Sequence, residues 1–178
     1  MKKTGIVICF ILIFIIIYLL QANLFSWFNL AGVKPNLFLI LVLTIGLFGG
    51  KIIGITSGVL FGFILDLLMG KSIGISITML GITGFIGGHL GKNFSKDSRI
   101  TMITIVALTT FIYEIGTIIL NLFINSMQIS LWYIIKTLLI EIIYNSIITI
   151  IIYPLIIKFG YMVEDTFNKS NKMLTRYF

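Results

Sequence analysis

Three of the six acidic side chains lie inside long apolar stretches, and these are Asp66, Glu114 and Glu141. A carboxyl group in an apolar membrane segment is costly, so a pairing or functional role is the first hypothesis for each. Asn121 lies two helical turns beyond Glu114 on nearly the same face, and Asn145 follows Glu141. These residue types indicate a polar pocket or a docking site for a partner helix, or simple hydrogen bonding between helices of one bundle.

Glycines precede Asp66 in a regular row. Gly54, Gly58 and Gly62 recur at every fourth position, so consecutive members share one narrow helix face. Glycine costs about 1 kcal/mol in a helix interior relative to alanine, which indicates that something approaches the backbone closely. One interpretation is that a partner's membrane span packs on Gly58, Gly62 and Asp66. The other is a packing seam within the bundle, with Asp66 capping the next turn.

The three acids are expected at compatible depths. At about 1.5 Å per residue, Asp66 and Glu114 lie about 21 Å from the cytoplasmic boundary of their spans, and Glu141 lies about 14 Å from the external boundary. We therefore expect the three carboxyls to meet in the outer half of a bundle, with at least one protonated and able to donate a hydrogen bond. Lys136 is a candidate ion-pair partner from another helix.

Enzyme chemistry has little support in the sequence. Ser57 lies in a segment similar to the serine motif of intramembrane proteases, but the single histidine, His89, differs from it in depth and no orienting carboxylate is near. Asp66 is the one aspartate in a span, so an aspartyl protease would lack its second acid. Phosphate-binding loops, paired histidine ligands and dinucleotide fingerprints do not occur. We expect no enzyme activity, no metal site and no cofactor.

The elements that must position these side chains are membrane helices. The chain is 58% hydrophobic and 11% charged, with a mean hydropathy of +1.13, which is outside the usual range of soluble domains. Cys9 is the one cysteine, so a disulfide framework is excluded. The net charge of +7 is scattered between apolar spans, which argues against nucleic acid as a partner.

The apolar stretches predict an all-α fold, a six-helix transmembrane bundle that forms a single polytopic membrane domain over residues 1–178. The first stretch continues without a clear cleavage site, so we interpret it as a retained span rather than a signal peptide. The second is short and rich in glycine at its end, so it is tilted, re-entrant or tightly coupled to the next. The fourth carries a second glycine seam, a partner for the third. The predicted spans are residues 5–27, 37–50, 52–69, 75–91, 100–125 and 132–157, followed by a cytoplasmic tail at 158–178.

The distribution of lysine and arginine predicts the orientation. Ten of these residues fall on the side of the N-terminus, and Lys34, Lys71 and Lys136 fall on the other. Because cytoplasmic loops carry the excess of positive charge, both termini are expected in the cytoplasm of a multi-pass protein of the bacterial cytoplasmic membrane.

The motifs and length resemble the family of the bacterial rod shape-determining protein MreD. The resemblance rests on Pro35-Asn36-Leu37 at the start of the second span, Gly58, Gly62 and Asp66 in the third, Gly74 after a short turn, and Gly84-Phe85 before a basic loop. It covers nearly the whole chain, although Val59 stands where family members usually have an aromatic residue or leucine.

The resemblance implies a non-enzymatic scaffold of the cell-elongation (rod) complex, needed for cell shape and lateral peptidoglycan synthesis. Its implied partners are a single-span MreC-like protein and, through it, the MreB filament, RodA and its transpeptidase, together with membrane lipid. The candidate contacts for a partner or a pocket are Gly58, Gly62, Asp66, Glu114, Asn121, Glu141 and Asn145.

The same family is similar in fold to the substrate-binding subunit of energy-coupling-factor transporters. That similarity supports an alternative function, because a polar pocket in the outer half of a six-helix bundle would suit a carrier for a vitamin or another small solute.

Overall fold

The computed structural model describes residues 3–24, 32–69, 73–91, 98–125 and 130–167. A short π-helical segment, η1 (Leu20–Leu24), continues the first helix. The regular structure of the described residues is helical throughout, which confirms the predicted all-α fold. The α-helices are α1 (Lys3–Leu19), α3 (Leu37–Gly49), α4 (Lys51–Met69), α5 (Ile75–Leu90), α6 (Arg99–Asn125) and α7 (Leu131–Phe167).

Three helices are long and apolar enough to cross a membrane by length and composition, namely α4, α6 and α7. The helices α1, α3 and α5 are apolar but shorter. Each of the predicted spans contains one of these helices, while the number that crosses the bilayer stays a prediction.

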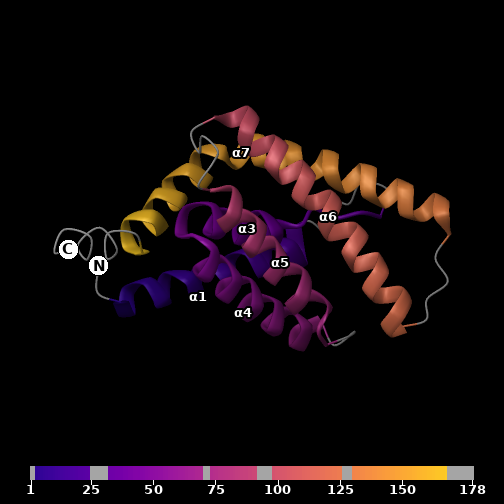
Figure 1. Ribbon diagram of the computed structural model, residues 1–178, viewed down its shortest axis with the longest axis horizontal. Helices are drawn as coiled ribbons and strands as arrows, with labels where there is room; N and C mark the ends of the chain where they lie inside the picture. The colour runs from indigo at the N-terminus through magenta and orange to yellow at the C-terminus, as the bar shows by residue number, and fades with distance from the viewer. Residues whose placement is uncertain (1–2, 25–31, 70–72, 92–97, 126–129, 168–178) are drawn as a thin grey trace.

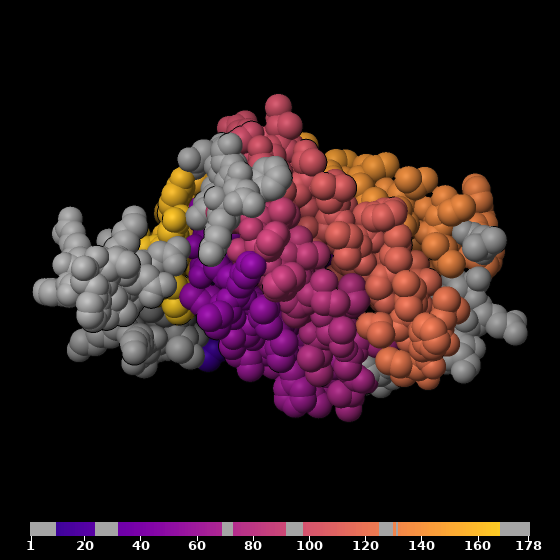
Figure 2. Space-filling view, viewed as in Figure 1, coloured from indigo at the N-terminus to yellow at the C-terminus, as the bar shows by residue number. Residues whose placement is uncertain are grey.

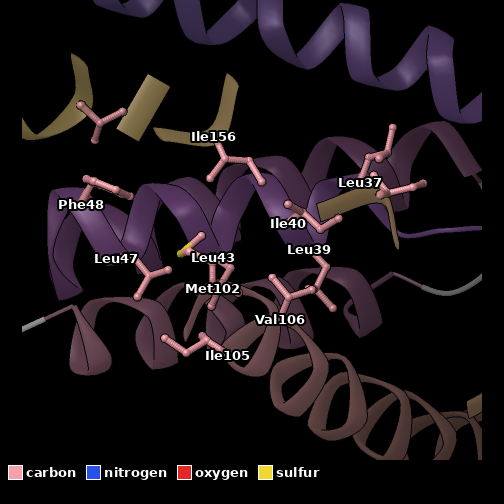
Figure 3. Packing of buried hydrophobic residues seen from close by; sticks show 12 residues of the cluster. Leu37, Leu39, Ile40, Leu43, Leu47, Phe48, Met102, Ile105, Val106 and Ile156 are labelled. Atoms are coloured by element: carbon pink, nitrogen blue, oxygen red, sulfur yellow. The ribbon is translucent and has the colours of Figure 1, made fainter. Parts of the chain in front are cut away.

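The helix α3 lies at the centre of the molecule. All 13 of its residues are buried, and it contacts α4, α5 and α7. A helix that is hydrophobic on every side is stable only when other elements surround it. Figure 3 shows Leu43 and Leu47 of α3 packed near Met102 of α6, with Ile156 of α7 on the opposite side.

A single residue, Gly50, separates α3 from α4, and its φ of +91° favours glycine. Tight coupling to the next helix is therefore the arrangement adopted by the short second segment. Because α3 spans only about 20 Å at 1.5 Å per residue, it is short for the roughly 30 Å hydrocarbon layer.

The helices α4 and α5 lie side by side (Figure 1). Their glycines allow this approach: a Cβ at Gly54 would meet the carbonyl oxygen of Gly84, and one at Gly58 would meet that of Leu80. A Cβ at Gly62 would lie 2.5 Å from the carbonyl oxygen of Ser76. The predicted pairing of the third span with the glycine seam of the fourth is confirmed.

The last helix, α7, continues beyond the predicted end of the sixth span at residue 157. It bends near Pro154 (Figure 1), where proline removes one backbone hydrogen bond. Beyond the bend, a Cβ at Gly160 would meet the ring of Phe48, and Val163 is buried. This packing holds residues 158–167, the first part of the predicted tail, in a helix against the bundle. Residues 168–178 lie outside the described residues, and the cytoplasmic location of the tail stays a prediction.

The outer surface is largely apolar. Large side chains such as Phe123, Ile52 and Ile100 are more than three quarters exposed, a surface suited to lipid rather than water. In the space-filling view, the end of α6 and the start of α7 reach the side of the molecule opposite α1 (Figure 2).

Candidate functional site: the buried polar side chains

Asp66 caps the next helix. Its Oδ2 accepts hydrogen bonds from the backbone N–H of Gly74 (2.7 Å) and Ile77 (3.4 Å), and its Oδ1 accepts one from Ser76 (3.1 Å). The first amides of a helix have no partner within that helix, and a negative charge there is favoured by the helix dipole. The capping role that the sequence left open is therefore the one present in the structure.

Gly58 and Gly62 face α5. Their Cα atoms lie against the backbone around Leu80, Ser76 and Ile77, so this face is already occupied within the chain. A partner's span could reach these glycines only if α5 were displaced.

A second polar group joins three helices around Asn145. The Asn145 Oδ1 accepts from the backbone N–H of Asn36 (2.8 Å), and its Nδ2 donates to the Oγ1 of Thr110 (3.0 Å). Asn36 also caps α3, because its Oδ1 accepts from the N–H of Leu39 (3.1 Å). Asn145 therefore connects the start of α3 with α6 and α7, although it lies 109 residues from Asn36 in sequence.

Glu114 of α6 and Glu141 of α7 lie beside each other, and Asn145 is next to Glu141. Both carboxyls are buried. The predicted meeting of acids thus holds for this pair, whereas Asp66 is bonded to the amides of α5.

The remaining polar residues that the sequence singled out are Asn121 of α6 and Lys136 of α7. The Asn121 Nδ2 donates to the carbonyl of Thr117 on its own helix (2.8 Å). Lys136 is exposed, and no ion pair between it and the acids is present in the described part of the chain.

Two further residues, which the sequence did not single out, belong to the group around Asn145. Thr110 accepts the hydrogen bond from Asn145, and Tyr113 lies beside the side chain of Asn36. The signal was the spacing, since Thr110, Tyr113 and Glu114 occupy one helix face at three- and four-residue intervals.

The two candidate protease residues, Ser57 and His89, each interact with residues of their own helix. The Ser57 hydroxyl donates to the carbonyls of Ile53 (2.8 Å) and Gly54 (3.0 Å) in its own helix. The His89 ring stacks on Phe85 with centroids 6.1 Å apart. Among the described residues, no group of three or more His, Cys, Asp or Glu side chains could hold a metal ion.

The comparison with protein families is decisive. A family model described as the rod shape-determining protein MreD matches residues 1–163. The chain belongs to the MreD family. No curated protein and no solved structure matches it, so the similarity to energy-coupling-factor subunits has no structural match behind it. Membership makes this chain a rod-shape-determining membrane protein.

The motif residues of this MreD-family chain hold its helices together. Asn36 caps α3 and bonds to Asn145, while Asp66 caps α5. Gly58 and Gly84 allow backbone contact between α4 and α5. The motif that carries the resemblance is therefore explained by helix packing and capping in the described residues.

Proposed function

We propose that this chain is a non-enzymatic scaffold of the cell-elongation complex that supports lateral peptidoglycan synthesis by binding an MreC-like single-span protein. Family membership supports the place in cell-shape determination. The separate bonding of Ser57 and His89 supports a scaffold rather than a catalyst. MreB, RodA and its transpeptidase would be reached through that partner.

The partner contact is proposed on the outer halves of α6 and α7. Gly58, Gly62 and Asp66 are engaged by α5, and Asn145 is fully buried. Glu114, Glu141 and Asn121 are the other polar candidates, all on α6 and α7. The two glutamates are buried beside each other, so a partner would reach them through the poorly covered first turns of α7.

Two observations favour this region. The first turns of α7 are poorly covered: Trp132 is 75% exposed and Leu139 is 54% exposed. The hydroxyl oxygens of Thr117 and Thr137, one on each helix, are buried without a hydrogen-bond partner, so the packing of α6 against α7 leaves polar groups unsatisfied here. A partner helix would cover the exposed apolar side chains of these first turns. That exposed surface is the observation that carries this proposal.

The proposed orientation places both termini in the cytoplasm. Lys51 at the start of α4 and Arg99 at the start of α6 lie at one end of the bundle, whereas Lys34 precedes α3 and Lys136 lies near the start of α7 at the other. This distribution supports a cytoplasmic location for the end with Lys51 and Arg99.

The test replaces the carboxyl pair. Glu114→Leu with Glu141→Leu keeps the interior apolar and removes the polar contact, because a buried polar pair can often be replaced by hydrophobic residues without loss of stability. We expect recovery of the MreC-like partner in mild detergent to fall about tenfold, within the range of ~0.6–2 kcal/mol for one polar contact between membrane helices. Thr56→Ala, at an exposed position of α4, is the control and should retain the partner.

Unchanged recovery with a correctly inserted double variant would move the interface elsewhere. Recovery of ATP-binding-cassette subunits or a bound vitamin with the wild-type chain would instead support the carrier.

A further inference from the structure

Lys51, Phe85 and His89 form a row at one end of the α4–α5 pair. The Lys51 Nζ lies 5.4 Å from the centroid of the Phe85 ring. The His89 ring stacks on the same Phe85 ring, with centroids 6.1 Å apart. A cation over an aromatic face is attracted by the ring quadrupole, so Phe85 restricts where the ammonium group lies.

The backbone fixes this row. A Cβ at Gly88 would meet the N and Cα atoms of Lys51, so the last turn of α5 lies directly against the first residue of α4. Phe85 is 45% exposed and His89 is exposed, so the row faces outward at the end of the bundle. The adjoining outer surface is apolar, with Ile52, Val59 and Ile82 all exposed.

The positive charge of this row is not paired with a carboxylate among the described residues. Asp66 caps α5, the pair Glu114–Glu141 lies between α6 and α7, and Glu164 and Asp165 near the end of α7 have interactions of their own and no ion pair with Lys51. Arg99 adds a further cation at the same end, where its guanidinium lies 5.3 Å from the ring of Tyr153. A phosphate group is the natural complement to such a surface when it lies at a membrane boundary.

We propose that Lys51 and His89 bind the phosphate of an anionic phospholipid, with an acyl chain along the apolar outer face of α4 and α5. The ammonium of Lys51 supplies charge and hydrogen bonds, His89 supplies a ring N–H donor, and Phe85 positions both. This site is separate from the α6–α7 region and does not depend on the proposed partner.

The experiment compares phosphatidylglycerol with phosphatidylcholine of the same acyl chains. The full-length chain in detergent is titrated with each lipid, and bound lipid is counted by native mass spectrometry. The wild type is expected to prefer phosphatidylglycerol, and Lys51→Gln to reduce that preference about fivefold, the order expected for one basic side chain at an anionic surface. Lys51→Arg should retain the preference, and His89→Phe, which keeps an aromatic ring but removes the N–H donor, should reduce it.

Lys136→Gln is the matched control, because it removes the same charge from an exposed position near the start of α7. It should leave the preference unchanged. Phe85→Leu keeps both nitrogen donors and should weaken the preference less than Lys51→Gln. An equal loss in Lys51→Gln and Lys136→Gln, a wild-type preference in Lys51→Gln, or no preference in the wild type would overturn the proposal.

Discussion

At the scale of single residues, the buried polar side chains are bonded in two groups with different tasks. Asp66 offers a carboxylate to the first amides of α5, and Asn145 joins α3, α6 and α7. Loss of either side chain would leave backbone N–H groups buried without an acceptor. A buried donor without an acceptor costs more free energy than the hydrogen bond itself contributes.

Replacing Asp66 tests the cap. Asp66→Asn keeps the size of the side chain but removes its charge and one acceptor oxygen, so we expect the free energy of unfolding to fall by about 1–2 kcal/mol. Thermal unfolding in detergent measures this change. Lys136→Gln removes a charge at an exposed site and should have little effect. Equal stability of the Asp66 variant and wild type would argue against the cap.

Replacing Asn145 tests the second group. Asn145→Ala leaves the N–H of Asn36 without its acceptor and creates a small cavity, and we expect a loss of about 1–3 kcal/mol. Ser146→Ala is the comparison, because the Ser146 hydroxyl donates to a carbonyl of its own helix. The same thermal measurement should show a smaller loss there, and an equal loss would mean that the connection between α3 and α7 is not important for stability.

At the scale of the helices, the α4–α5 pair is a backbone-to-backbone contact. Without Cβ atoms at Gly54, Gly58 and Gly62, the two helices approach until backbone atoms touch. Interfaces of this kind depend on van der Waals packing, since apolar side chains gain little by leaving lipid for another apolar surface.

Two alanine substitutions distinguish the effect of the α4–α5 backbone contact on stability from the effect of helix propensity. Both Gly58→Ala and Gly81→Ala gain about 1 kcal/mol of helix propensity. The new Cβ at 58 would strike the backbone of Leu80, whereas at 81 it would meet one side-chain atom of Val59 at 3.2 Å. We expect Gly58→Ala to lower the unfolding temperature and Gly81→Ala to leave it nearly unchanged. Equal effects of the two substitutions would contradict the contact.

The sequence predicted the helices and the α4–α5 pairing because both follow from local spacing. Depth along the spans brought Glu114 and Glu141 together, but depth gives no direction around the bundle, so Asp66 was placed with them. The bond between Asn36 and Asn145 depends on how α3 is inserted among the other helices, which spacing alone does not determine. The packing of Gly160 of α7 on Phe48 was not predicted, because it is also a long-range contact.

At the scale of the whole molecule, α3 is enclosed by the other helices, and polar contacts join α4 to α5, α3 to α7 and α6 to α7. The end of α6 and the start of α7 lie away from α1 (Figure 2). The proposed scaffold would therefore have a stable interior and one region, at the start of α7, available to its partner.

The proposed orientation is testable with single cysteines in a Cys9→Ala background. Ser130 and Asp165 are both exposed, before α7 and near its end. In intact spheroplasts, an impermeant maleimide should label Ser130→Cys, while Asp165→Cys should require permeabilisation. Labelling in the reverse pattern would place the termini outside.

The most direct test of the proposed scaffold is photo-crosslinking in cells. A photoreactive residue replaces Leu139 on α7 or Leu60 on α4, which are 54% and 55% exposed, and crosslinked proteins are identified by mass spectrometry. A crosslink from position 139 to a single-span MreC-like protein, with none from position 60, is the predicted result. A crosslink to that protein from position 60 alone, or to transporter subunits from position 139, would contradict the account.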